Sequence, residues 1–171
     1  MEGEQRRERL LEILKDSNEP VSGSELARKL GVSRQVIVQD IALLRAVNKN
    51  ILATTKGYIL YYQSKEKHNR GFLVNHTNEE IVDELYTIID NGGKVLDIIV
   101  EHDVYGQISV DLILENRKDV DEFYRRLVEN GAKPLKVLAD GNHIHTVEAA
   151  SETILDNIER ALKERGYLIS V

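Results

Sequence analysis

The stretch SGSELARKLGVSRQVIVQDIALLR, residues 22–45, decides the fold of the first part of the chain. A serine cap, at Ser22 or Ser24, followed by apolar residues three or four positions apart, predicts a helix that ends at Gly31. After a short turn, Ser33 caps a longer helix with the same apolar spacing. Helix, glycine-containing turn and helix, in this order, form the layout of a helix-turn-helix motif.

Polar side chains open the second helix of this motif. Arg34, Gln35 and Gln39 are the polar residues that the apolar spacing leaves outside. The start of the second helix is the end that meets base edges in the major groove of DNA. Helix-turn-helix folds also serve as protein-contact modules, so a three-helix domain that binds no DNA is the alternative.

Two flanking segments complete the domain. Residues 4–16 carry an apolar stripe and predict a helix before the motif. Residues 51–60, ILATTKGYIL, predict two short strands around Lys56, in the position of a wing. Together with the motif they predict a winged helix-turn-helix domain over residues 1–62.

Residues 6–60 follow the pattern SxxELAxxLGVSRQxVxxDIxxLR and resemble the winged helix-turn-helix of biotin-repressor-type transcription regulators. The resemblance implies double-stranded operator DNA as a partner. It implies that the side chains facing DNA are Ser33, Arg34, Gln35 and Gln39. Lys56, in the wing, would reach a phosphate or the minor groove.

Charge is divided unevenly along the chain. Residues 1–62 hold 10 Lys and Arg against 8 Asp and Glu, a net charge of +2. Residues 63–171 hold 13 against 21, a net charge of −8. Because DNA is a polyanion, the negatively charged second part repels it, and only the first part is compatible with DNA binding. The imbalance therefore predicts two domains with different partners.

Composition excludes several classes of protein. The chain has no cysteine, which rules out disulfides, zinc ribbons and thiol catalysis. No run approaches the roughly 18 apolar residues that a bilayer span needs. The charged first residues, MEGEQRRERLLEILKDS, do not resemble a signal peptide. We therefore expect a cytoplasmic protein with no membrane partner.

The remaining chain alternates strands and helices, which predicts a second domain over residues 71–171. The charged segment before it fits a linker or a solvated strand edge, and we expect a linker at residues 63–70. Interleaved strands and helices, joined partly by hairpins, indicate an α+β fold in which helices pack on one face of a sheet. In chain order, the expected elements are strand 71–76, helix 77–91, strands 94–101 and 107–114, helix 115–131, hairpin strands 134–140 and 143–150, helix 151–166 and strand 167–171.

Two histidines alternate in the predicted strand HIHTV, residues 143–147. Residues i and i+2 of a strand point to the same face and lie about 6.7 Å apart. His143 and His145 can therefore converge on one metal ion, at bonds of about 2.1 Å, while Ile144 packs into the core behind them. The same pattern also arises on exposed strands that bind nothing.

A third histidine, His76, precedes helix 77–91, in which Glu80 and Glu84 share one face. Three imidazoles and one carboxylate suit zinc, nickel, iron or copper rather than magnesium or calcium. Alternatively, His76 supports the helix start and Glu80 only closes a capping box with Thr77. Spacing alone does not separate Glu80 from Glu84 as the carboxylate ligand.

The segments HTNEEIVDEL (76–85), EHDVYGQISVDL (101–112) and HIHTV resemble the three-histidine (3H) domain of small bacterial transcription regulators, over essentially all of residues 71–171. Together with the first domain, they are similar to niacin-responsive repressors of NAD-biosynthesis and niacin-uptake genes. The resemblance implies nicotinic acid as corepressor and a homodimer on a palindromic operator. It implies one divalent transition metal per chain, nickel, zinc or iron, held by His76, Glu84, His143 and His145.

His102 and Tyr105, in the segment EHDVYG, allow two interpretations. His102 can begin a turn with Asp103 and Gly106 between two strands, or it can line an effector pocket together with Tyr105. Because the name of the three-histidine family rests on its histidines, we expect His102 and Tyr105 to line the effector pocket.

Two other functions compete with a nicotinate-responsive repressor. In one, the metal itself is the signal and no organic effector binds. In the other, an open metal site with a nearby carboxylate and histidine activates water for hydrolysis. The chain has no HExxH motif and no deaminase motif, so we expect that it is not an enzyme.

Overall fold

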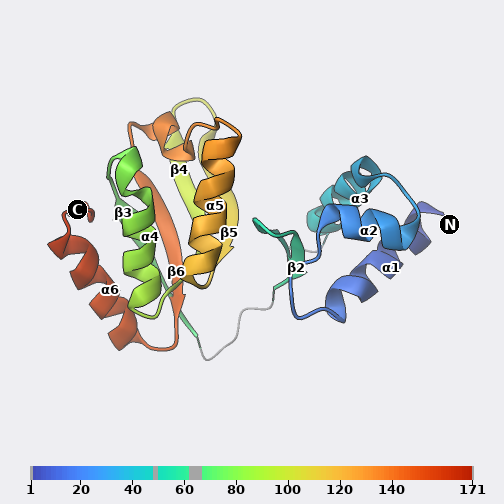
Figure 1. Cartoon of the computed structure of the whole chain (residues 1–171), viewed down its shortest axis with the longest axis horizontal. Helices are drawn as coiled ribbons and strands as arrows, with labels where there is room; N and C mark the ends of the chain where they lie inside the picture. The colour runs from blue at the N-terminus through green and yellow to red at the C-terminus, as the bar shows by residue number, and fades with distance from the viewer. Residues whose placement is uncertain (1, 48–49, 62–66, 171) are drawn as a thin grey trace. The chain divides into compact units, whose positions relative to one another are not determined.

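The computed structural model describes residues 2–47, 50–61 and 67–170. The chain divides into two compact units, residues 1–63 and 64–171 (Figure 1). Each unit encloses a hydrophobic core of its own. No helix in the described part of the chain is long and apolar enough to cross a membrane.

The first unit consists of three helices and a two-stranded antiparallel hairpin: α1 (Gly3–Lys15), α2 (Gly23–Leu30), α3 (Arg34–Val47), β1 (Ile51–Ala53) and β2 (Tyr58–Leu60). Ser22, rather than Ser24, caps α2, because its Oγ accepts the N–H of Glu25 at 3.1 Å. Gly31 ends α2 in the left-handed conformation, with φ at 66°. The predicted winged helix-turn-helix is confirmed.

The wing is attached to the start of α2 by backbone hydrogen bonds. Val21 and Tyr58 exchange two such bonds, each of 2.8 Å. Gly57 has φ at 144°, and a Cβ atom there would lie 2.3 Å from the carbonyl oxygen of Val21. Only glycine therefore allows the hairpin to approach so closely.

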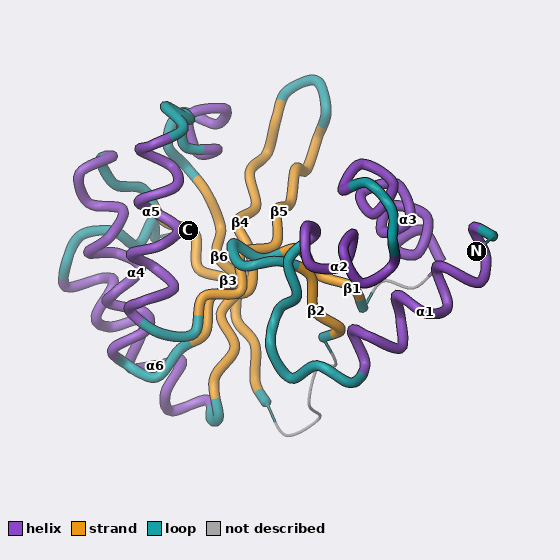
Figure 2. The backbone as a smooth tube through the Cα atoms, turned by 45° about the vertical axis from the view of Figure 1, so that its right-hand side comes forward, coloured by secondary structure: helices purple, strands orange, loops and turns teal. Residues whose placement is uncertain are grey.

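The second unit is a four-stranded antiparallel sheet, in the order β3-β6-β4-β5, with helices on one face. Figure 2 shows α4, α5 and α6 on the same side of this sheet, so the predicted α+β arrangement is confirmed. Its elements are β3 (His68–Val74), η1 (Asn78–Glu80), α4 (Ile81–Asp90), β4 (Lys94–His102), β5 (Gly106–Leu114), α5 (Arg117–Glu129), η2 (Leu135–Ala139), β6 (His143–Ala149) and α6 (Glu152–Glu164).

The core of the second unit lies between the sheet and the three helices. Phe72 and Val147, from neighbouring strands, are buried together with Leu85 of α4 and Ile158 of α6. Gly93, just before β4, allows the chain to pass close to this core, because a Cβ atom there would lie 2.7–2.8 Å from three apolar side chains. The covered face of the sheet is therefore the interior of the domain.

Two expectations for this domain are wrong. Residues 134–140 do not form a hairpin strand: η2 is a 3-10 helix that begins after Pro134, and β6 pairs with β3 and β4 instead. Residues 167–170 do not form a strand either: among them, Leu168 makes an isolated bridge to Val74, and Val171 lies outside the described residues. The predicted linker 63–70 lies partly outside the described residues, and its last three residues are the start of β3.

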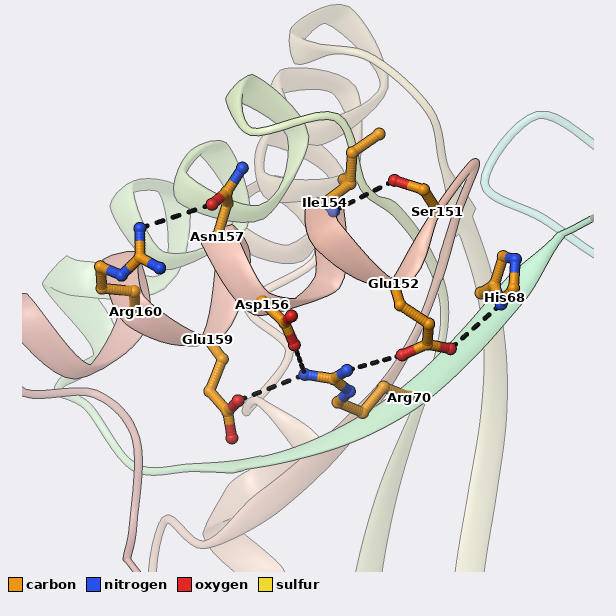
Figure 3. A network of polar contacts seen from close by, with 9 residues as sticks. All are labelled: His68, Arg70, Ser151, Glu152, Ile154, Asp156, Asn157, Glu159 and Arg160. Atoms are coloured by element: carbon orange, nitrogen blue, oxygen red, sulfur yellow. Dashed lines mark hydrogen bonds and ion pairs between the residues drawn. The ribbon is translucent and has the colours of Figure 1, made fainter.

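A charged network joins the start of β3 to α6 (Figure 3). The guanidinium of Arg70 pairs with Glu152 at 2.7 Å, Asp156 at 2.9 Å and Glu159 at 3.2 Å. His68 contacts the other oxygen of Glu152 at 3.0 Å. Because the carboxylates are exposed and screened by water, we assign this network a positioning role rather than a large share of the stability.

Candidate metal centre and DNA-binding surface

The two histidines of β6 lie inside the domain, on the face of the sheet that the helices cover. His143 is 2% exposed and His145 is 3% exposed. Ile144 lies on the opposite face, where it is half-buried and pairs in register with Leu73 and Ile99. The expectation that Ile144 packs into the core behind the histidines is therefore reversed.

The start of α4 brings the third imidazole and the carboxylate to the same place. Thr77 and Glu80 form the predicted capping box, in which the N–H of Thr77 donates to Glu80 Oε2 at 3.1 Å. Glu84 is 0% exposed, and its Oε2 lies 3.6 Å from His76 Nε2 and 3.5 Å from His145 Nε2. The structure thus places Glu84, and not Glu80, among the imidazoles.

Backbone carbonyls orient all three imidazole rings. The Nδ1 atoms of His76, His143 and His145 lie 2.8, 2.8 and 2.7 Å from the carbonyl oxygens of Thr77, Gly141 and Asp97, respectively. A carbonyl oxygen only accepts, so each Nδ1 carries the proton in these contacts. Each Nε2 is then left with its lone pair available to a metal ion, as in the outer contacts of known metal sites.

The donor atoms form a compact group that fits a metal ion. Those of His76, Glu84 and His143 all lie within 4.8 Å of one another, and His145 joins the group through Glu84. Nε2 of His76 and both carboxylate oxygens of Glu84 are buried without a hydrogen-bond partner among the described residues. A buried carboxylate without partners is costly, and a bound cation would satisfy it.

The pKa shifts describe the charges of this cluster in the absence of metal. Burial, together with the charge on His145, lowers the pKa of His143 to about 3. Burial raises the pKa of Glu84, but the imidazoles of His145 and His76 outweigh it and lower this pKa to about 2. Burial lowers the pKa of His145, but Glu84 raises it above its usual value. Glu84 thus favours the protonated form of His145, and a metal ion bound at Nε2 would compete with that proton.

A cavity of about 210 Å³ adjoins the cluster. His76, Glu84, His143 and His145 line one part of it, and apolar side chains such as Ile81, Leu112 and Phe123 line most of the rest. Two lysines, Lys133 and Lys136, complete its polar lining. An apolar cavity with a few polar groups on one side is the usual form of a site for a small organic ligand.

His102 and Tyr105 lie elsewhere, at the turn between β4 and β5. The side chain of Tyr105 is 78% exposed, and neither residue lines the cavity beside the histidine cluster. Nδ1 of His102 accepts the N–H groups of Val104 at 3.1 Å and Tyr105 at 3.2 Å. This geometry supports the turn interpretation, and it does not place the two residues in the effector pocket predicted for them.

The residues expected to face DNA lie at the start of α3. Ser33, Arg34, Gln35 and Gln39 are all exposed. Ser33 also caps the helix, since its Oγ accepts the N–H of Val36 at 3.3 Å. Lys56 lies in the turn of the β1–β2 hairpin and is half-buried. The surface is therefore polar and open where a recognition helix meets base edges.

Sequence reasoning missed the role of Lys136. The side chain is 6% exposed, and its Nζ donates to the carbonyl oxygen of His76 at 2.6 Å. Residues 134–140 were predicted to form a hairpin strand, and the alternation of side chains in a strand does not predict that Lys136 is buried. A single lysine within the apolar run PLKVLA was the available signal.

Fold and site together define a two-domain DNA-binding regulator. Residues 6–59 match the HTH domain family, and residues 69–171 match the 3H domain family. The chain is 43% identical to a protein of Thermotoga maritima named probable transcription repressor NiaR, over 97% of this chain and 94% of that protein. It is 41% identical to the transcription repressor NadR of Bacillus subtilis, over 98% and 94% of the two chains. The chain belongs to the 3H-domain family of NiaR- and NadR-type transcription repressors.

Proposed function

We propose that this repressor responds to nicotinic acid through a metal ion held in its second domain. The observation that carries the proposal is the buried carboxylate of Glu84, which has no hydrogen-bond partner in the described part of the chain and faces imidazoles whose Nδ1 atoms are already engaged. A buried carboxylate beside imidazoles oriented in this way suits a bound cation. The identity of the effector, nicotinic acid, is inferred from the resemblance to niacin-responsive repressors.

The proposed ligands are His76, Glu84, His143 and His145. Three imidazole nitrogens and one carboxylate oxygen suit nickel, zinc or iron, one ion per chain. When bound, the metal would supply a Lewis-acidic centre beside the cavity. The chain itself contributes the orientation of the rings and the exclusion of water from the donor atoms.

The cavity beside this centre suits nicotinic acid in size and chemistry. At about 210 Å³ it is smaller than the pockets of roughly 300–1,000 Å³ that hold drug-sized molecules. A single aromatic ring would lie against the apolar wall that includes Leu112 and Phe123. Its polar atoms would face the histidine cluster and the lysines.

The proposed output is repression of genes for NAD biosynthesis or niacin uptake, by a homodimer on a palindromic operator in the cytoplasm. The two recognition helices of such a dimer must lie about 34 Å apart, one turn of B-DNA. Effector binding would favour the dimer arrangement that meets this spacing. A coupling of about 1–3 kcal/mol, or about 5–150-fold in operator affinity, is typical of such switches.

Operator binding measured with metal alone, nicotinate alone and both together tests the proposal. We expect tight binding only when both are present. Full binding with metal alone, unchanged by nicotinate, would establish a metal sensor instead. Hydrolysis of nicotinamide by the metal-loaded protein would show an enzyme and would overturn the proposed function.

A further inference from the structure

Lys136 is a buried cation for which the described ranges of the chain contain no anionic partner. Its side chain is 6% exposed, and its Nζ donates to the carbonyl oxygen of His76 at 2.6 Å. Among the residues that the structure describes, no carboxylate pairs with this ammonium group. One carbonyl satisfies one of its three N–H donors.

Burial of an unpaired ammonium group is unfavourable, so a charge in this position needs an explanation. Lys136 lines the same cavity as the histidine cluster, whose one carboxylate, Glu84, is directed at imidazoles. Most of the remaining wall is apolar. A molecule that fills the cavity therefore meets the histidine cluster and the ammonium groups of Lys133 and Lys136. Of these two lysines, Lys133 is exposed to solvent and Lys136 is buried.

We propose that Lys136 is the counter-ion for a carboxylate on the effector, and that it makes the site select an aromatic acid over the corresponding uncharged amide. The inference rests on the proposed function and deepens it, because it names the residue that sets specificity. An acid pairs with the ammonium group. An amide of the same shape leaves the buried charge without a partner, and the site therefore rejects it.

Calorimetric titration of the metal-loaded full chain with nicotinate and with nicotinamide tests the assignment. We expect wild type to prefer the acid by about 10- to 100-fold, the effect of one hydrogen-bonded charge. Lys136→Gln keeps a donor for the carbonyl oxygen of His76 but removes the charge. It should lose nicotinate affinity by a similar factor and bind both ligands about equally.

Two variants control for charge and for folding. Lys133→Gln removes the same charge from an exposed residue that also lines the cavity, and it should keep the preference for the acid. Lys136→Arg keeps the buried charge and should keep most of the preference. Metal content by elemental analysis and the thermal unfolding midpoint of Lys136→Gln should match those of wild type. If Lys136→Gln fails to fold, the comparison of wild type with Lys136→Arg decides.

The outcomes separate this inference from the proposed function. Equal binding of acid and amide by wild type, or an unchanged preference in a folded Lys136→Gln, overturns the role of Lys136 and leaves a nicotinate-responsive repressor in place. Failure of metal-loaded wild type to bind nicotinate at all overturns the effector proposal and the role of Lys136 with it.

Discussion

Oε2 of Glu84 lies 3.5 Å from Nε2 of His145, and both side chains are almost completely buried. The contact joins the first turn of α4 to β6, one of the two inner strands of the sheet. Neither oxygen of Glu84 has a hydrogen-bond partner among the described residues. The contact with His145 therefore leaves both oxygens available to a metal ion. The relationship makes Glu84 the centre of the proposed metal site.

Replacement of Glu84 by glutamine should remove the metal. The amide keeps the size of the side chain but loses the charge that binds a cation, so we expect metal content to fall from one ion per chain to near zero, measured by elemental analysis after dialysis. Glu80→Gln is the matched control, because glutamine also closes a capping box and Glu80 lies outside the cluster. Equal metal loss in both variants would show that the helix start, and not Glu84, controls metal binding.

The double variant His143→Ala/His145→Ala should also lose the metal. Since both imidazoles are buried rather than surface groups, we expect a further loss of stability of about 2–5 kcal/mol from the space left behind. Urea unfolding, measured on metal-free proteins, isolates this loss from the contribution of the metal. Retention of one ion per chain in the double variant would exclude both histidines as ligands.

The orientation of these two histidines shows where sequence reasoning stops. Alternation predicts correctly that His143 and His145 share a face, since this follows from backbone geometry alone. It does not say which face the helices cover. The prediction placed the apolar Ile144 in the core and the histidines on the exposed face. In the structure, Ile144 is half-buried on the opposite face, and the histidines are buried under the helices.

Local signals were more reliable than long-range ones. The serine cap of α2, its glycine end and the Thr77–Glu80 capping box each depend on residues within one turn, and all were predicted. Residues 134–140 were not, because a short apolar run fits a strand, a 3-10 helix or a buried turn equally well. The carbonyl groups that orient the imidazoles belong to residues whose side chains carry no signal for that role.

Substitutions in the β4–β5 turn should leave the effector site unchanged. Tyr105→Ala removes an exposed ring that does not line the cavity, so metal content and nicotinate affinity should match those of wild type. His102→Ala should loosen the turn without changing either quantity, because its Nδ1 accepts two local N–H groups. Titration calorimetry on both variants checks this. A tenfold loss of nicotinate affinity in Tyr105→Ala would restore the pocket role predicted from the sequence.

The recognition helix and the wing should respond differently to substitution. Arg34→Ala or Gln35→Ala should weaken binding to the operator by about 1–3 kcal/mol and relax base preference, because these exposed residues begin α3. Lys56→Ala should weaken binding to all sequences alike and reduce the salt slope by about 1. Fluorescence anisotropy on operator and random DNA at several salt concentrations separates the two effects. An identical loss on random DNA for all three variants would contradict this division of roles.

Separation of the two units should divide DNA binding from sensing. Each unit has its own core, so we expect fragments 1–63 and 64–171 to fold independently. Fragment 1–63 should bind operator DNA without any response to metal or nicotinate. Because it lacks a dimer contact, this fragment should lose the gain in operator affinity that comes from binding two half-sites at once. That gain is typically about 100- to 10,000-fold.

Fragment 64–171 is the matched partner in this experiment, because it keeps the histidine cluster and the cavity. It should bind one metal ion and nicotinate as tightly as the full chain does, and light scattering should show it as a dimer. If fragment 1–63 instead bound the operator as tightly as the full chain and still responded to nicotinate, the dimer contact and the sensor would both belong to the winged helix-turn-helix. The buried cluster around Glu84 would then need a purely structural explanation.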